Sequence, residues 1–165
     1  MKKIVILFLL VCNSLLIAQT SQFRTFPDME KKLGTHFPIE NYKDKEGKNF
    51  DSNYLKGKNT LINLWFTTCA PCITEIPILN KLKESVPNAN FIAITHDPLD
   101  KVNNFLLKRN YTFYQITDAG KQLQSYLMVQ RFPMSFILDK EGKIREITGL
   151  VNEEKLETIK KLLSE

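Results

Sequence analysis

Apolar and polar positions follow two periods along this chain, and the change between them marks its central segment. Residues 61–66 form an apolar run interrupted only by Asn63, which is typical of a buried β-strand. Beyond residue 72 the apolar residues recur every three or four positions, as on the buried face of a helix. They are Ile73, Ile76, Leu79, Leu82 and Val86. The pattern predicts a strand over residues 60–67, followed by a helix that ends near Val86.

The rest of the chain repeats this alternation. Short apolar runs predict strands over residues 90–95, 112–117, 134–138 and 143–148. Helical spacing predicts one helix capped by Asp97, a short helix over 121–128 and a last helix capped by Asn152. Residues 37–50 have the pattern of a β-hairpin with its turn at 45–48. Alternating strands and helices predict an α/β fold with helices on both faces of a central sheet.

The N-terminal residues have the pattern of a secretory leader. Lys2 and Lys3 precede an apolar stretch over residues 4–17, and Ala18 is a small residue at a possible cleavage point. The stretch is short for a membrane-spanning helix. We therefore expect a signal peptide over 1–19, with an uncleaved anchor as the alternative. The mostly polar residues 20–36 are expected to form a linker, and 37–165 the folded domain.

Length and charge limit the function classes. A chain of 165 residues is enough for one domain with one substantial core. The formal net charge is +5, and the basic residues are dispersed rather than clustered, so they do not form a nucleic-acid footprint. A glycine-rich phosphate loop is also missing from the sequence.

The cysteines carry the candidate chemistry. Cys12 lies in the leader, whereas Cys69 and Cys72 lie where the central strand is expected to pass into the helix. Unpaired amides and the helix dipole at that end favour an anion, so the Cys69 thiolate should form more easily than that of a free cysteine. A zinc site would need further ligands, and His36 and His96 are not spaced to supply them.

Two other interpretations of the Cys69–Cys72 pair have less support. Covalent haem attachment needs a histidine directly after the second cysteine, and Ile73 is there instead. A purely structural disulfide would close a loop too short to constrain the unfolded chain much. A pair that cycles between dithiol and disulfide is the interpretation that the strand-to-helix context favours.

The residues around the pair resemble a known family. The run Trp-Phe-Thr-Thr-Cys-Ala-Pro-Cys at 65–72 resembles the active site of thioredoxin-fold proteins, in particular the TlpA/ResA-like thiol-disulfide oxidoreductases of bacterial cell envelopes. Residues 54–58 resemble that family's approach to its first core strand, and residues 132–139 with 141–144 its cis-proline segment and terminal hairpin. The resemblance implies a thioredoxin-like fold: a mixed sheet with an N-terminal β-hairpin extension and a central αβ insert.

Roles for three residues follow. Cys69 is expected to be the exposed nucleophile and Cys72 the more shielded resolving thiol, the two forming the redox-active disulfide without a metal. Glu75 lies one turn after Cys72 and matches the family's active-site glutamate, which implies that it relays the Cys72 proton. The alternative is an acid that merely suits the helix dipole.

Substrate-binding residues are expected beside the pair. The resemblance implies that Pro133 is cis and that Phe132, Pro133 and Met134 pair with the substrate backbone, as in strand addition. An ordinary turn proline is the alternative. Pro71 and Trp65 are expected to complete this surface, with core packing as the alternative for Trp65.

The implied function is a cell-envelope thiol-disulfide oxidoreductase that reduces protein substrates without a cofactor. Its expected partners are an apocytochrome c or another oxidised envelope protein and a membrane electron donor of the thioredoxin-reducing type, with no nucleic acid. A thiol peroxidase of the peroxiredoxin group would use a Pro-x-x-x-Thr-x-x-Cys run, and the chain has Ile62 and Phe66 at its first two fixed positions. A redox-sensing binding module, which needs no turnover, is the other alternative.

Overall fold

The chain folds around a five-stranded sheet. The computed structural model describes residue 23 and residues 26–165. The sheet has the order β3-β2-β1-β4-β5. Its strands are β1 (Thr60–Trp65), β2 (Asn90–Thr95), β3 (Tyr114–Ile116), β4 (Met134–Leu138) and β5 (Ile144–Thr148). The helices are α1 (Ala70–Ser85), α2 (Leu99–Leu106), α3 (Gly120–Tyr126) and α4 (Glu153–Ser164).

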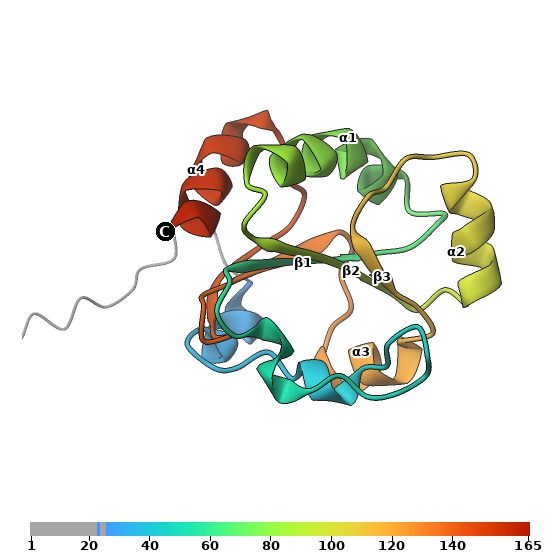
Figure 1. The fold of residues 1–165 in the computed structure, drawn as a ribbon, viewed down its shortest axis with the longest axis horizontal. Coiled ribbons are helices and arrows are strands. Elements are labelled where there is room, and N and C mark those ends of the chain that lie inside the picture. The colour runs from blue at the N-terminus through green and yellow to red at the C-terminus, as the bar shows by residue number, and fades with distance from the viewer. Residues whose placement is uncertain (1–22, 24–25) are drawn as a thin grey trace, which may run out of the picture.

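The predicted mixed sheet is confirmed. β1 pairs in parallel with β2 and antiparallel with β4, while β3 and β5 form the two edges. Figure 1 shows α1 and α4 over one face of the sheet and α3 on the other. The predicted αβ insert is also confirmed, because α2 and β3 lie between β2 and α3 in the chain.

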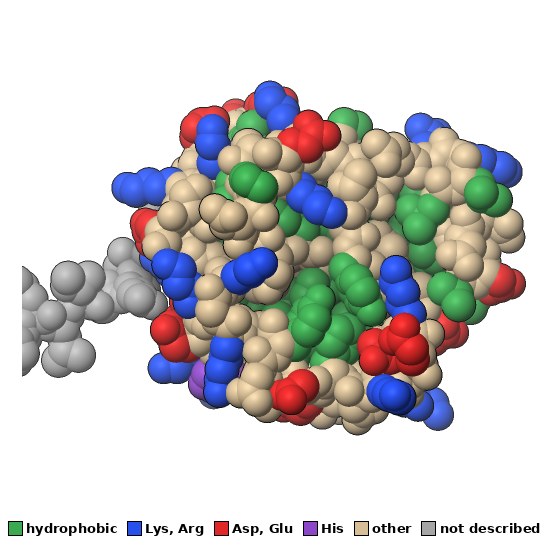
Figure 2. All heavy atoms as spheres, in the orientation of Figure 1, with side chains coloured by type: hydrophobic (Ala, Val, Ile, Leu, Met, Phe, Trp, Pro, Cys, Tyr) green, Lys and Arg blue, Asp and Glu red, His purple; other side chains and the backbone are tan. Residues whose placement is uncertain are grey.

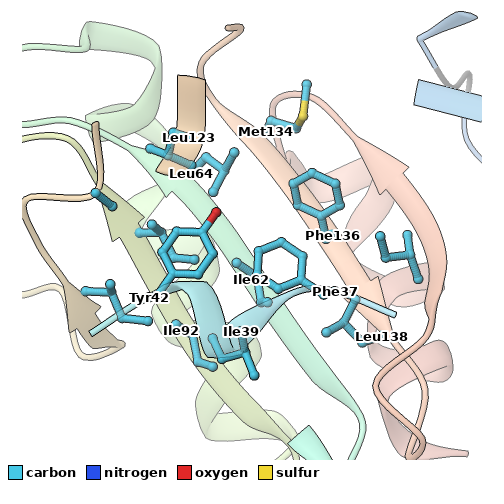
Figure 3. Packing of buried hydrophobic residues seen from close by; sticks show 14 of the residues in the cluster. Phe37, Ile39, Tyr42, Ile62, Leu64, Ile92, Leu123, Met134, Phe136 and Leu138 are labelled. Atoms are coloured by element: carbon cyan, nitrogen blue, oxygen red, sulfur yellow. The ribbon is translucent and has the colours of Figure 1, made fainter. Parts of the chain in front are cut away.

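The central strand β1 is buried along its whole length because both faces of the sheet are covered. Successive side chains of a strand point to opposite faces. Leu61 and Trp65 accordingly belong to the apolar cluster that contains Leu79 of α1. Ile62 and Leu64 belong to the cluster on the opposite face, shown in Figure 3. These two clusters hold β1 in place and so determine where the cysteine segment leaves the sheet.

The predicted N-terminal β-hairpin is confirmed only around its turn. Lys43 and Asn49 form an antiparallel bridge, flanked by backbone hydrogen bonds from Asp44 to Lys48 at 2.8 Å and from Phe50 to Tyr42 at 3.1 Å. The first half of the predicted hairpin is not a strand, because Ile39–Asn41 is a 3-10 helix. Ile39 and Tyr42 are buried against the sheet, as Figure 3 shows. Pro38 has no backbone N–H to offer a neighbouring strand. The segment therefore adds side chains to the core, and its short hairpin pairs with itself and adds no strand to the five-stranded sheet.

The predicted linker over 20–36 is wrong for residues 26–36. Pro27–Lys32 forms a 3-10 helix whose Met29 is buried, with 1% of its surface exposed. The Gly34 N–H donates to the carbonyl of Ile144 at 2.8 Å, which ties this segment to β5. The expected signal peptide over 1–19 lies outside the described residues. Among those described, no helix combines the length and the apolar character needed to cross a membrane.

Replacing Met29 by alanine should lower the free energy of unfolding by about 2–4 kcal/mol, because the change removes buried methylene and thioether atoms and leaves a cavity. The matched control is Met128→Ala, since Met128 is 90% exposed, and its effect should stay within about 0.5 kcal/mol. Urea denaturation of the two oxidised variants measures both values. Equal midpoints would show that residues 27–32 do not pack on the domain in solution.

Candidate active site

The cysteine pair lies at the N-terminus of α1, directly after the central strand. Cys69 is the N-cap residue of α1, and its sulfur forms a disulfide with Cys72. The Cα atoms of the pair are 5.2 Å apart. The backbone N–H of Cys72 donates to Sγ of Cys69 at 3.3 Å. A helix N-terminus that directs an amide at this sulfur favours negative charge on it once the disulfide is reduced.

The expectation that Cys69 is exposed is wrong for this oxidised form. Cys69 is 5% exposed and Cys72 1% exposed, so the expected order of shielding holds while both are buried. The half-buried rings of Phe66 and Phe132 pack against the apolar cluster that contains Cys69. Its chain neighbours Thr68 and Ala70 are exposed, so Cys69 lies directly below the surface.

The segment expected to bind substrate lies before β4. The Phe132–Pro133 peptide bond is cis, as predicted. The Phe132 ring is 5.2 Å from the Phe66 ring in an edge-to-face arrangement and joins the cluster that contains the two cysteines. Phe132 thus links the cis-proline turn to the segment that enters the redox pair.

Two residues expected at the substrate surface have buried side chains. Trp65 is 0% exposed, and its Nε1 donates to Oε1 of Gln115 at 3.1 Å, so its ring is core and cannot touch a bound polypeptide. Met134 is also 0% exposed, and its side chain belongs to the cluster on the other face of the sheet, as Figure 3 shows. Pro71 is exposed, and Pro133 is buried within its turn.

Beneath the pair, Glu75 lies in a buried hydrogen-bond network. Glu75 is 1% exposed. Its Oε1 accepts from Nδ2 of Asn63 at 2.7 Å, and its Oε2 accepts from the backbone N–H of Val151 at 2.7 Å. The same Asn63 Nδ2 donates to Ser135 Oγ at 3.1 Å, and the Tyr111 hydroxyl donates to Asn63 Oδ1 at 2.8 Å. Glu75 is therefore held in one position between α1, β1 and the chain that leads into α4.

This environment changes the acidity of Glu75. Burial raises the pKa of Glu75 to about 7, although hydrogen bonds from Val151 and Asn63 and the charge of Lys155 act in the opposite direction. Burial also raises the pKa of Tyr111 well above its ordinary value, so its hydroxyl keeps the proton that it donates. A carboxyl group with a pKa near neutrality can both accept and return a proton, which a general acid–base catalyst requires.

Two residues after β2 also belong to the site and were not predicted to do so. The His96 ring lies 5.7 Å from the Phe132 ring, beside the cis-proline turn. Asp97 is buried, and its Oδ2 accepts from the backbone N–H of Thr67 at 2.7 Å. The prediction that Asp97 caps α2 is wrong, because the N-cap is Pro98 and the Asp97 carboxylate turns to Thr67 instead.

Taken together, these positions serve the exchange of one disulfide for another. A reducible sulfur pair lies at a helix N-terminus, an aromatic turn borders it, and a carboxyl group able to handle a proton lies below. This is the chemistry of a thiol-disulfide oxidoreductase of the thioredoxin fold.

Comparison with known proteins identifies the family. The Redoxin family profile matches residues 24–163. The chain is 34% identical to the thiol-disulfide oxidoreductase ResA of Bacillus cereus over 158 residues, which cover 93% of this chain and 90% of that protein. It is 36% identical to ResA of Bacillus anthracis over 137 residues, 80% of this chain and 79% of that protein. The chain belongs to the Redoxin family and is a protein-disulfide oxidoreductase of the ResA type.

A solved structure agrees with the fold. The thioredoxin domain of a thiol-disulfide oxidoreductase from Bacteroides vulgatus superposes with a TM-score of 0.63 at 25% identity, over 74% of this chain and 91% of that domain. The predicted thioredoxin-like fold is thereby confirmed, although the hairpin on its N-terminal side is shorter than predicted and residues 26–36 pack on the domain instead of forming a linker.

Proposed function

We propose that this chain reduces disulfides of other proteins in the cell envelope, with Cys69 as the attacking sulfur. The Cys69 thiolate attacks a client disulfide, and one client sulfur leaves as a thiolate while a mixed disulfide forms. Cys72 then attacks Cys69, which releases the client as a dithiol and leaves the Cys69–Cys72 disulfide. Two electrons pass from the enzyme to the client. The observation that supports these roles is the Cys72 N–H directed at Cys69 Sγ from a helix N-terminus.

Glu75 is the proton carrier of the second step. Cys72 must lose its proton before it can attack, and its side chain is shielded from solvent at 1% exposure. Glu75 lies one helical turn further along α1, on the same face. Each of its carboxylate oxygens accepts one hydrogen bond from the network and keeps a second lone pair for a proton.

The client backbone docks at the Phe132–Pro133 turn. Phe66, Phe132 and His96 place their rings within 5.1–5.7 Å of one another at this turn. His96 is exposed, while the two phenylalanines are half-buried. Such a surface offers ring faces to apolar client side chains, while the turn supplies backbone groups for a short strand addition. Pro71, exposed within the Cys-x-x-Cys loop, borders the same surface.

The envelope location and the identity of the client belong to the same proposal. The leader pattern over 1–19 directs the chain to a compartment where disulfides persist. An apocytochrome c fits as client because its paired cysteines must be reduced before haem attachment. A membrane protein of the thioredoxin-reducing type would return electrons to the Cys69–Cys72 disulfide. Neither partner requires a cofactor on this chain.

A Cys72→Ser variant tests this proposal. It should stop after the first step and accumulate a mixed disulfide between Cys69 and the client, because no resolving thiol remains. Expression in an envelope-competent host, alkylation of free thiols and mass spectrometry of the adduct would identify the client. The control is the variant with both cysteines replaced, which should capture nothing. Equal recovery of proteins by the two variants would rule out disulfide exchange at Cys69.

The alternatives have less support. Phe66 stands where a peroxidase of the peroxiredoxin group needs a threonine hydroxyl, and its ring packs on Phe132 instead. A sensor without turnover has no use for a buried carboxyl group with a pKa raised to about 7 beside the resolving thiol.

A further inference from the structure

An ion pair between a buried carboxylate and an exposed lysine supports the loop that enters the redox helix. Asp97 is 3% exposed, and its Oδ2 accepts from the Thr67 N–H at 2.7 Å. Its Oδ1 lies 2.6 Å from Nζ of Lys101, one turn into α2. Its own backbone is held as well, since its N–H donates to Thr95 Oγ1 at 3.1 Å and its carbonyl accepts from the Asp118 N–H at 2.9 Å. The carboxylate is thus a fixed charge attached to the loop before Cys69.

The loop that Asp97 holds is the one that carries the sulfur. The Cys69 N–H donates to the carbonyl of Phe66 at 3.1 Å, so residues 66–69 form a tight turn that contains Thr67. Consecutive Cα atoms are about 3.8 Å apart, so the Cα atoms of Thr67 and Cys69 are at most about 8 Å apart. Charges in a partly buried site are screened by salt less than charges on the surface, so the Asp97 carboxylate acts on a thiolate formed at this turn.

Asp97 carries its charge at neutral pH. Burial alone would raise the pKa of Asp97, but hydrogen bonds from Lys101 and Thr67 outweigh it and hold the pKa below its ordinary value. Three titratable side chains lie near this carboxylate. Lys101 forms the ion pair, and His96 Nε2 lies 3.9 Å from Asp97 Oδ1. Asp118, whose N–H donates to the Asp97 carbonyl, accepts with its Oδ2 from the Leu99 N–H at 3.2 Å.

We propose that the Asp97–Lys101 pair positions the loop before Cys69 and that the balance of its two charges tunes the reduction potential of the Cys69–Cys72 disulfide. The carboxylate opposes the thiolate that forms on reduction, and the ammonium group offsets the carboxylate. Removing the carboxylate and removing the ammonium group should therefore shift the dithiol–disulfide equilibrium in opposite directions. The inference rests on the proposed role of Cys69 as the sulfur that carries the thiolate.

The test compares Asp97→Asn with Lys101→Met. Asparagine keeps an oxygen for the Thr67 N–H but leaves the lysine charge unopposed, so the reduced form should become more stable relative to the disulfide. Methionine leaves the carboxylate unopposed, so the reduced form should become less stable relative to the disulfide. Equilibration with glutathione, in which the disulfide and two glutathione thiols give the dithiol and glutathione disulfide, measures each effect. We expect a change of about fivefold in each equilibrium constant, which is about 20 mV in opposite directions.

A second readout is the rate of Cys69 alkylation by iodoacetamide at neutral pH, which should rise in Asp97→Asn and fall in Lys101→Met because the thiolate is the reactive form. The control is Lys56→Met. Lys56 is exposed at the opposite end of β1, and this change removes the same charge without moving the potential. Potentials that stay at the wild-type value, or that move in the same direction in both variants, would overturn the proposal.

Two features keep this test decisive. The Lys101 side chain is 44% exposed, so Lys101→Met should fold and carries the test even if Asp97→Asn does not. The glutathione equilibrium needs no client. Successful client trapping with unshifted potentials would therefore reject the charge balance alone, whereas shifted potentials without trapping would reject the proposed client reaction alone.

Discussion

Replacing Cys69 by serine should reduce the rate of insulin disulfide reduction in the presence of dithiothreitol to that of dithiothreitol alone. A serine hydroxyl does not ionise near neutral pH, so it cannot attack a disulfide as the Cys69 thiolate does. Cys72 cannot substitute, because it lies one turn inside α1 and is 1% exposed. Turbidity of the insulin B chain, followed with and without each variant, measures the effect.

The matched control for this loss is Thr68→Ser. Thr68 is the exposed neighbour of Cys69, and the change keeps the hydroxyl and the backbone of the loop. It should retain wild-type activity. Insulin reduction by Cys69→Ser above the rate of dithiothreitol alone would show that another group carries out the exchange.

Local patterns account for the parts of the site that the sequence could predict. β1 and α1 were predicted within two residues of their observed bounds, because an apolar run and a helical period meet at the Cys-x-x-Cys spacing. The cis bond before Pro133 could be predicted only from family resemblance. A lone proline carries no signal of its own isomer.

The network around Glu75 has no local signal. Its hydrogen bonds join residues separated in sequence by 48 positions for Tyr111 and Asn63, 72 for Ser135 and Asn63, and 76 for Val151 and Glu75. Each of these residues alone is consistent with an ordinary strand or loop position. Only the packing of α1 against β1 and the chain before α4 brings them together.

Burial was the least predictable property. Trp65 was assigned to the substrate surface, with core packing as the alternative, and strand alternation directs it into the core under α1. Met29 was assigned to a linker because it is one apolar residue among charged ones, yet it is buried. In both cases tertiary packing decides exposure, and sequence proximity does not.

Replacing Glu75 by glutamine should slow the release of the client by about a hundredfold, the lower range of general acid–base catalysis, while the formation of the mixed disulfide stays close to the wild-type rate. Wild-type release should rise with pH through the Glu75 pKa of about 7, because only the ionised carboxylate accepts the Cys72 proton. The variant should lack this limb of the profile. Stopped-flow measurement of mixed-disulfide decay, using the intrinsic fluorescence of Trp65 as the signal, separates the two steps.

The same substitution should change how stability depends on pH, which tests the burial of the carboxyl group independently of catalysis. Because the folded-state pKa of Glu75 is raised from 4.5 to about 7, the folded protein holds the proton more tightly than the unfolded chain. The contribution of Glu75 to wild-type stability should therefore fall as pH rises between these values, by about 3 kcal/mol in total, and should not change below them.

Glu75→Gln removes this pH dependence, so the free energy of unfolding of the variant should rise relative to that of the wild type as pH rises from 4.5 to about 7. The network can accommodate glutamine if the Asn63 amide turns over, since the Tyr111 and Ser135 hydroxyls can each act as donor or acceptor. Urea denaturation of the oxidised proteins across this pH range measures the difference. A constant difference between wild type and variant would mean that Glu75 is ionised throughout, and it would then be only a structural partner of Val151 and Asn63.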